Sequence, residues 1–218
     1  MPFRFDDVEI SWLGHAAFLI THEDTRYYLD PFKIKPKGAA DAVLITHEHF
    51  DHLSIEDLRK IVKPETEIVA PESCKENLRA FGMGIVRLVK PGESLEVKNA
   101  KIETIPAYNI NKFRAPGVVY HPIEQGGVGY IIEVGGIRIY HAGDTDFIPE
   151  MRNLEVDVAL VPVSGTFVMT AEEAADAVNT FKPKVAIPMH FGSIVGSRSD
   201  AETFKKLAEV DVVILEKE

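Results

Sequence analysis

The chain has 218 residues, of which 45% are hydrophobic and 27% are charged. This length and balance predict one soluble globular domain over residues 1–218, and no apolar run of about 18 residues is present to span a membrane. The net charge of −10 and the pI of about 5.3 argue against nucleic acid as a partner, because phosphate backbones select basic surfaces.

The N-terminus is acidic and has no secretory pattern, so we expect a cytoplasmic protein. The single cysteine, Cys74, cannot form an internal disulfide. Gln occurs once, at Gln125, while Lys and Glu are frequent, a bias that fits a thermophilic source.

The first half of the chain reads as short strands separated by turns and two helices. Strands are predicted over residues 8–13, 16–21, 26–30, 42–46, 67–70, 85–88, 94–97 and 101–105. One helix is expected over residues 55–61, where Ser54 and Asp57 form a capping-box pattern, and Pro64 ends it. A second helix is expected over residues 72–81, ended by Gly82.

Residues 106–127 show no periodicity and contain three Pro and three Gly, which predicts a long loop. A hairpin across Gly135-Gly136 follows. The remaining elements are strands over 156–161, 184–188 and 212–215 and helices over 171–180 and 200–208. The two halves look alike in outline, which favours one domain with β-sheets in the middle and helices outside.

The segment with the most potential ligands reads His-Glu-His-Phe-Asp-His over residues 47–52 and follows the buried strand 42–46. Imidazole nitrogens and carboxylate oxygens suit Zn²⁺, Mn²⁺ or Fe²⁺. His47 and His49 point the same way on an extended turn and can chelate one ion. Asp51 and His52 lie one turn further on and can reach a second ion. A solvated charged loop is the alternative, but it explains poorly why so many ligands fall together.

Two later strand ends offer further ligands. Asp144 follows the strand 137–141, and its carboxylate could bridge two cations. His190 follows the strand 184–188. Taken alone, each also fits a structural explanation, a polar turn for Asp144 and a hydrogen-bonded core histidine for His190.

Several segments together resemble the metallo-β-lactamase superfamily over nearly the whole chain: residues 12–15, 29–31, 46–52, 106–107, 139–145 and 188–190. Within it, the chain is most similar to the compact prokaryotic group related to L-ascorbate-6-phosphate lactonase and the YtkL-like hydrolases. The resemblance implies an α/β fold, a four-layer αβ/βα sandwich with the site at one edge between the sheets. It also implies the ligands: His47 and His49 for a first metal, Asp51, His52 and His190 for a second, and Asp144 as the bridge.

One segment departs from the superfamily pattern. Asn109 stands where a third histidine for the first metal is expected, and an amide oxygen is a weaker zinc ligand than imidazole. The first site is therefore expected to be loose, empty or filled by another histidine, with three candidates: His15, His121 and His141. We expect His15 near the metals, His121 as a surface or substrate residue, and His141 as support for the ligands.

The resemblance implies a metal-dependent hydrolase that uses two zinc ions, or Mn or Fe, and a metal-bound hydroxide. Asp51 is the candidate catalytic proton shuttle, because it is a carboxylate beside the nucleophile. The expected substrate is a small anionic ester, either a phosphodiester or a lactone. Its anionic group is expected to contact residues of the long loop and its surroundings: Tyr108, Lys112, Arg114, Tyr120, His121 and Arg198.

Two alternatives stay open. A nuclease of the same superfamily is disfavoured by the acidic pI. A non-catalytic metal-binding or regulatory protein with a degenerate site is supported only by Asn109. The sequence leaves open which bond is cut and whether the protein forms a homo-oligomer.

Overall fold

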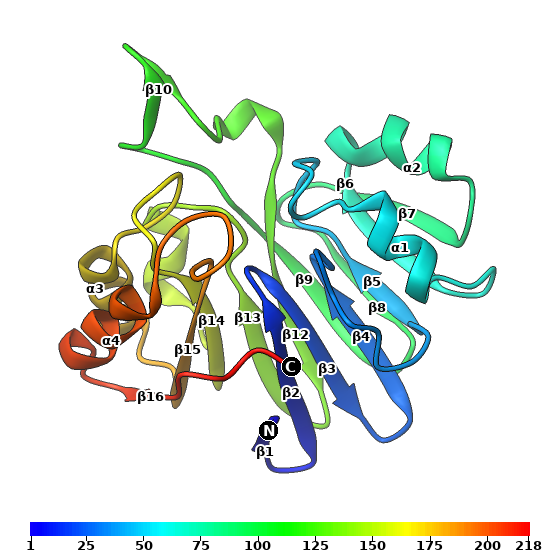
Figure 1. Ribbon diagram of the computed structural model, residues 1–218, viewed down its shortest axis with the longest axis horizontal. Coiled ribbons are helices and arrows are strands. Elements are labelled where there is room, and N and C mark those ends of the chain that lie inside the picture. The colour runs from blue at the N-terminus through cyan, green and yellow to red at the C-terminus, as the bar shows by residue number, and fades with distance from the viewer.

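The computed structural model describes residues 1–218, which form two seven-stranded sheets packed face to face (Figure 1). The first sheet keeps chain order across its width: β1 (Phe3–Phe5), β2 (Val8–Gly14), β3 (Ala17–His22), β4 (Thr25–Leu29), β5 (Ala42–Leu44), β6 (Glu67–Pro71) and β7 (Ile85–Val89). Helix α1 (Ile55–Ile61) and helix α2 (Lys75–Phe81), which the short 3₁₀ turn η1 (Glu72–Cys74) precedes, cover its outer face.

The second sheet runs in the order β16 (Asp211–Val212), β15 (Val185–Met189), β14 (Val158–Pro162), β13 (Ile137–His141), β12 (Val128–Val134), β9 (Ala100–Pro106) and β8 (Ser94–Val97). Helices α3 (Ala171–Phe181) and α4 (Arg198–Leu207) cover its outer face (Figure 1). The predicted four-layer αβ/βα sandwich is confirmed. None of the helices is long and apolar enough to cross a bilayer.

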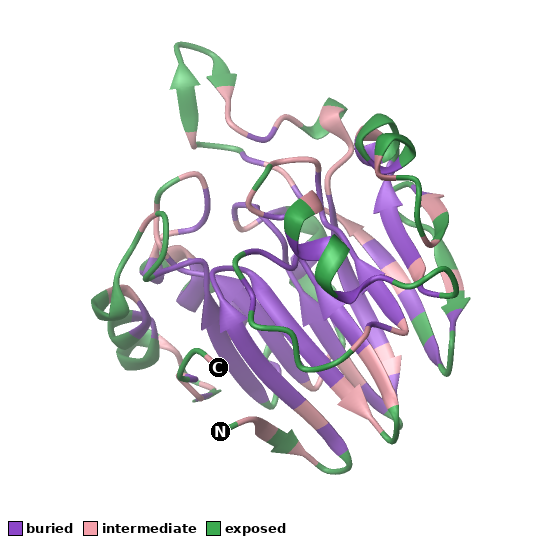
Figure 2. Cartoon of the chain, turned by 45° about the vertical axis from the view of Figure 1, so that its right-hand side comes forward, coloured by how far each residue is buried: buried purple, intermediate pink, exposed green.

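Alternating side chains along the strands separate two hydrophobic cores. In β4, Tyr27 and Leu29 point into the larger core between the sheets, while Tyr28 points into the smaller core beneath α1 and α2. This is the two-residue period of a strand whose two faces are both covered. The central strands are accordingly buried along most of their length, as Figure 2 shows.

The parallel part of each sheet positions the candidate ligands. Strands β4 to β7 are parallel in the first sheet, and β13 to β16 are parallel in the second. Open α/β sheets bind ligands in the crevice beyond the carboxyl ends of such strands. The segments after β5, β13 and β15 leave the sheets at one edge of the sandwich, the upper edge in Figure 1.

The structure adds elements that the sequence did not predict. These are β1, the 3₁₀ turn η3 (Pro149–Asn153) and, within the predicted long loop, a small ribbon of β10 (Phe113–Ala115) and β11 (Val118–Val119) followed by η2 (Ile123–Gln125). The predicted helix 72–81 begins as a 3₁₀ turn rather than an α-helix. Helix α4 begins earlier than predicted, because Ser197 and Asp200 form its capping box.

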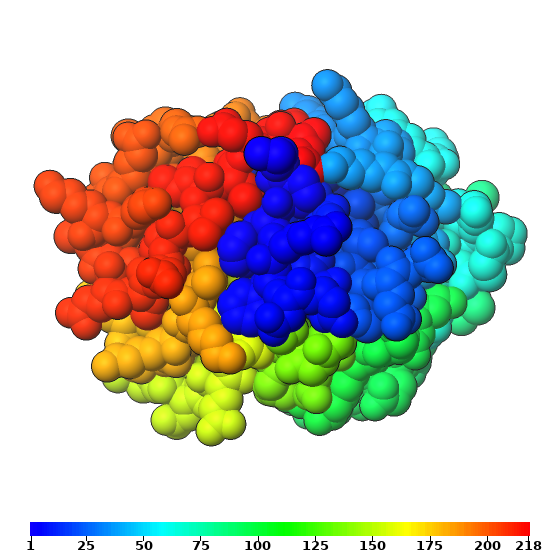
Figure 3. All heavy atoms as spheres, turned by 90° about the horizontal axis from the view of Figure 1, so that it is seen from below, coloured from blue at the N-terminus to red at the C-terminus, as the bar shows by residue number.

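The last predicted strand is shorter than expected because the chain turns away from the second sheet. Only Asp211–Val212 pairs with β15, and the tail then crosses to β2, where the Glu218 amide donates to the Trp12 carbonyl at 3.1 Å. The amino group of Met1 lies 3.1 Å from the Glu218 carboxylate. Both ends of the chain therefore meet on the underside of the molecule (Figure 3).

Asp57, in the first turn of α1, anchors the segment that follows β4. Its carboxylate accepts hydrogen bonds from the backbone amides of Lys33 (2.8 Å) and Ile34 (3.2 Å) and from the Ser54 hydroxyl. Burial opposes ionisation of Asp57, but these bonds and Lys60 outweigh burial and hold the pKa of its carboxyl below the ordinary value.

Replacing Asp57 with alanine is expected to lower the free energy of unfolding by about 2–3 kcal/mol, because the buried Ile34 amide and the partly buried Lys33 amide lose their acceptor. A carboxyl whose pKa is depressed on folding stabilises above its unfolded pKa, and that stabilisation is lost as the pH falls through the folded pKa. The stability gap between wild type and variant, measured by denaturant unfolding, should therefore be full at neutral pH and shrink below the ordinary carboxyl pKa of about 4. A gap independent of pH would contradict this role.

Candidate metal centre

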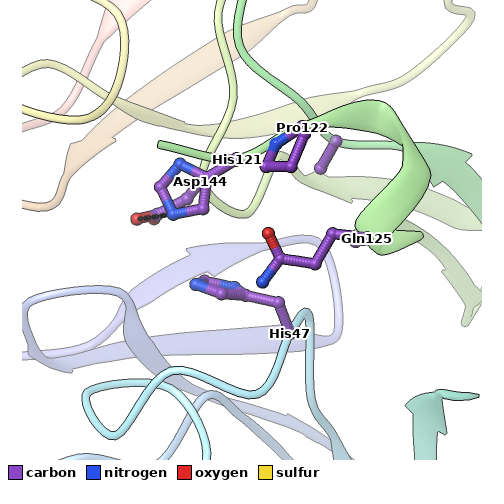
Figure 4. Close-up of a pocket in the computed structure, with 7 residues that line it drawn as sticks. His47, His121, Pro122, Gln125 and Asp144 are labelled. Atoms are coloured by element: carbon purple, nitrogen blue, oxygen red, sulfur yellow. Dashed lines mark ion pairs between the residues drawn. The ribbon is translucent and has the colours of Figure 1, made fainter. Parts of the chain in front are cut away.

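Three imidazoles converge where β5 ends. Nδ1 of His49 lies 3.0 Å from Nε2 of His47 and 3.2 Å from Nε2 of His121. A cavity of about 10 Å³, room for roughly one water molecule or ion, lies beside them and is lined by His47, His121, Gln125 and Asp144 (Figure 4). Three imidazoles with nitrogens within 4.8 Å of one another, two of them lining an ion-sized cavity, are suited to a first metal position.

His121 fills the place that Asn109 leaves, and it is buried rather than a surface residue of the loop. Asn109 Oδ1 accepts hydrogen bonds from the His121 backbone amide (2.9 Å) and from Nδ1 of its ring (3.0 Å). Asn109 Nδ2 in turn donates to the Asp146 carboxylate (3.1 Å) and the Phe167 carbonyl (2.9 Å). Asn109 therefore orients His121, and the group beside β5 has three potential histidine ligands without Asn109.

A second group of potential ligands lies beside the first and comprises His15, Asp51, His52 and His190, with donor atoms within 4.8 Å of one another. Asp51 Oδ2 lies 3.0 Å from His15 Nε2 and 4.0 Å from His52 Nε2. The rings of His15 and His190 are 4.1 Å apart between centroids. The histidines are fully buried, while Asp51 keeps 15% of its side chain exposed, so a molecule in the pocket can reach it.

Asp144 lies between the two groups. Its Oδ1 is 3.3 Å from His52 Nε2, while its Oδ2 is 3.2 Å from His190 Nε2 and 3.6 Å from His121 Nε2. The turn before it needs glycine, because Gly143 has φ +65° and a Cβ there would lie 3.0 Å from the Val128 carbonyl oxygen. The position of Asp144 suits a carboxylate that offers one oxygen to each of two cations.

The surroundings of the histidines direct one nitrogen of each ring into the centre. Nδ1 of His52 lies 2.7 Å from the Asp30 carboxylate, and Nδ1 of His190 lies 3.1 Å from the Ser164 hydroxyl. Such outer partners fix the tautomer and orientation of metal-binding histidines. The inward atoms, Nε2 of His52 and His190 and Oδ1 of Asp144, are buried and face only the carboxylate or imidazoles of the centre, without a well-formed hydrogen bond. Because buried polar atoms are normally paired, this set fits cations.

The buried groups of the centre shift one another's pKa. Burial opposes ionisation of Asp144, but His190 and His52 outweigh burial and hold the pKa of its carboxyl well below the ordinary value. Burial alone would lower the pKa of the His52 imidazole, yet the Asp144 and Asp30 carboxylates raise it well above the ordinary value. Burial lowers the pKa of His47 and His121, which keeps both rings neutral, the form that binds metal.

Backbone strain is concentrated at this edge of the sandwich. His15, Asp30 and His190 all have positive φ angles, of 54°, 41° and 61°. Residues other than glycine adopt this conformation only where the surrounding structure holds them in it. Here the His190 amide donates to the His15 carbonyl at 2.9 Å, and the Trp12 indole donates to the same carbonyl at 2.9 Å. These bonds keep two potential ligands in place.

Two other predicted residues support the centre from outside. His141 Nε2 donates to the Ala16 carbonyl (2.8 Å), and its Nδ1 accepts from the Gly143 amide (3.3 Å), so the ring holds the turn before Asp144. Burial lowers the pKa of His141. The Tyr108 hydroxyl donates to Glu150 at 3.2 Å, and its backbone amide donates to Thr145 Oγ1, next to Asp144, at 3.2 Å.

The structure does not bring the predicted cations to the ligands. Arg114 is exposed on the β10–β11 ribbon, which projects from the sandwich (Figure 1). The ammonium group of Lys112 lies 2.6 Å from Glu173 and 3.4 Å from Asp146, and Arg198 pairs with Glu216 and Glu202. The two cations Lys112 and Arg198 are thus occupied by carboxylates.

A larger pocket of about 330 Å³ opens above the two groups of ligands. At its inner end lie His49, Asp51, His121 and Asp144, and around it lie Phe50, Tyr120, Phe167 and Ile194. Of the residues expected to contact a substrate, Tyr120 and His121 line this pocket and Arg114 does not. The pocket is large enough for a small molecule next to the ligands.

Sequence reasoning missed Asp30, Ser164 and Asp146 as partners of the ligands. Each is a single polar residue in an apolar or mixed segment, and its role depends on contacts with distant parts of the chain. Asp146 offered one signal, because it lies two residues after Asp144 and a second carboxylate there needs a partner.

Comparisons with known proteins identify the family of the chain. Residues 9–190 match the family described as the beta-lactamase superfamily domain. A metal-dependent hydrolase from Methanopyrus kandleri is 36% identical over 230 residues, which cover 96% of this chain and 97% of the relative. Another from Thermococcus onnurineus is 35% identical over 224 residues, which cover 95% of this chain and 96% of the relative.

Solved structures of metal-dependent hydrolases also resemble this chain. A metal-dependent hydrolase from Parabacteroides distasonis superposes with a TM-score of 0.84 at 32% identity, covering 100% of this chain and 98% of that one. A metallo hydrolase from Ignicoccus hospitalis has a TM-score of 0.77 at 25% identity, covering 96% and 95%. The narrower likeness to the L-ascorbate-6-phosphate lactonase group stays a prediction. The chain belongs to the metallo-β-lactamase superfamily and stands among its metal-dependent hydrolases.

Proposed function

We propose that the protein binds two divalent cations, zinc by preference, and hydrolyses a small anionic ester, a phosphodiester or a lactone. His47, His49 and His121 would hold the first cation, and Asp51, His52 and His190 the second, with Asp144 between them. The observation that carries the proposal is the set of buried, inward-facing ligand atoms without a well-formed hydrogen bond, namely His52 Nε2, His190 Nε2 and Asp144 Oδ1. Cations held there would lower the pKa of a bound water to about 7 and stabilise negative charge on the attacked group.

The residues of the chain have separate parts in this reaction. Asp51 is the only partly exposed carboxylate of the centre, so it can pass a proton to the leaving group. His15 lies 3.0 Å from Asp51 Oδ2 and holds the carboxylate in position. Burial of Asp51 opposes ionisation, but His15 and His52 outweigh burial and lower the pKa of its carboxyl, which favours the ionised form.

The charge of the centre supports an anionic substrate. Two divalent cations would exceed the charge of Asp51 and Asp144, which leaves a net positive centre at the inner end of a pocket without Lys or Arg. The anionic group would therefore bind at the cations rather than at loop side chains. On this account, substitution of Arg114 with alanine leaves KM for an anionic substrate unchanged, contrary to the role expected for it from the sequence.

The test is turnover of bis-p-nitrophenyl phosphate and of a simple lactone by protein stripped with a chelator and then reloaded. We expect turnover of at least one substrate only after zinc or manganese is restored, with maximal rate at about two ions per chain. Hydrolysis that survives chelation would contradict the proposal. So would a protein that holds two ions and cleaves neither substrate. Cleavage of single-stranded RNA with neither small ester hydrolysed would favour a nuclease instead.

A further inference from the structure

The pocket above the metal centre has an apolar side that the proposed reaction does not use. Phe50, Tyr120, Phe167 and Ile194, here named the apolar wall, line it outside the ligands. A site that bound only a small hydrophilic ester would have no need of three aromatic rings beside its cations.

Phe50 is the most exposed part of the apolar wall. It lies between the ligands His49 and Asp51, and 69% of the residue is open to solvent. Ile194, from the loop after β15, is 40% exposed. Exposed apolar side chains gathered around a pocket mark binding surfaces, whereas single ones scattered over a protein need no explanation. These two come from different halves of the chain and meet at one pocket.

Phe167 is held in the wall despite backbone strain. Its φ is +71°, a conformation unfavourable for a bulky side chain. Its carbonyl accepts a hydrogen bond from Asn109 Nδ2 at 2.9 Å, and its ring packs edge-on against Tyr120 with centroids 4.6 Å apart. Asn109 is also the residue that orients His121. The Asn109 side chain therefore positions both the His121 imidazole and the Phe167 segment at the pocket.

We infer that the apolar wall binds a flat apolar substituent of the substrate, an aryl ring by preference, while the ester group faces the cations. The inference rests on the proposed function, because it concerns the same pocket. Aromatic rings pack well against other rings, and ligand pockets combine apolar walls with a few polar groups that fix orientation. The substrate class is thus an ester that joins a small anionic or polar centre to an aromatic group.

Two phosphonates separate the wall from the cations, because they share the anionic group and differ only in phenyl or methyl. Isothermal titration calorimetry on zinc-loaded protein is expected to give about 10-fold tighter binding of phenylphosphonate, since the phenyl ring buries more apolar surface. Phe50→Ala is expected to bring the ratio of the two affinities close to 1. Phe113→Ala, an aromatic residue of similar exposure on the β10–β11 ribbon, should keep the ratio of the wild type.

Phe167→Gly adds a readout that a purely structural role would not give. Glycine adopts positive φ without strain, which offsets part of the packing lost with the ring, so the variant should lose the preference for phenylphosphonate with little change in melting temperature. A lower melting temperature with the preference retained would assign Phe167 to the fold and overturn its place in the wall.

Different results would overturn the apolar wall and the metal centre. Equal affinity for the two phosphonates in a protein that holds zinc overturns the apolar wall and leaves the hydrolase proposal intact. A wild-type preference that survives both Phe50→Ala and Phe167→Gly also overturns it. A protein that takes up no zinc after dialysis refutes the metal centre, and the substrate inference with it.

Discussion

Replacing Asp144 with asparagine is expected to reduce bound zinc from two ions per chain to one at most and to lower kcat by about 10³-fold or more, a loss of about 4 kcal/mol of transition-state stabilisation. The side chain keeps its shape but loses the charge that faces His52, His190 and His121. Without that charge, no group lies between the two sets of ligands to balance the cations.

The measurement pairs metal analysis by mass spectrometry with turnover at saturating substrate. Asp176→Asn, at an exposed position of α3, is the matched control, because it removes a carboxylate of the same kind away from the centre. Asp144→Asn protein that retains two ions and near-normal kcat would show that the carboxylate does not bridge the cations.

Replacing His121 with alanine is expected to empty the first metal position and leave the second occupied. The variant loses one of the three imidazoles of this position. Nδ1 of His49 lies 3.0 Å from Nε2 of His47 and 3.2 Å from Nε2 of His121. We expect about one ion per chain and a fall in kcat on the order of 10²- to 10³-fold.

Asn109→Ala should give a smaller effect of the same kind, because it removes only the partner that orients His121. Loss of such an outer partner typically weakens metal affinity or activity by about 10- to 100-fold. His22→Ala is the control, since His22 contacts Asp7 and Asn99, neither of which belongs to the centre. If Asn109→Ala were more damaging than His121→Ala, Asn109 itself would have to be the ligand.

Periodic and local signals explain why most of the fold could be predicted. Alternation and apolar runs identified the sheet strands other than β1, and the Ser54 capping pattern identified α1 with its observed bounds. The two glycines between β12 and β13 indicated the hairpin, because such turns need positive φ angles that glycine adopts readily. Both glycines have positive φ in the structure. The β10–β11 ribbon could not be predicted in this way, because its strands have only three and two residues and none of them is buried.

The residues of the candidate site also divide into those that a local motif reveals and those that only the fold brings together. His47 to His52 form a dense local motif, so their chemistry could be inferred from the sequence alone. His121 could not, because its position depends on Asn109, Asp146 and Phe167, which lie in three separate segments and meet only in the fold. The long loop carries cations in its sequence, but carboxylates of α3 and of the turn after β13 neutralise Lys112, which the loop alone does not reveal.

The proposed reaction requires two cations between the sheets, with His121 as the third histidine of the first metal site. The most direct test is a crystal structure of zinc-loaded protein with anomalous scattering recorded at the zinc absorption edge. The account predicts two anomalous peaks about 3.5–4 Å apart, the spacing of two-metal sites, with Nε2 of His121 bound to the peak beside His47 and His49. A single peak, or two peaks with His121 turned away from both, would contradict it.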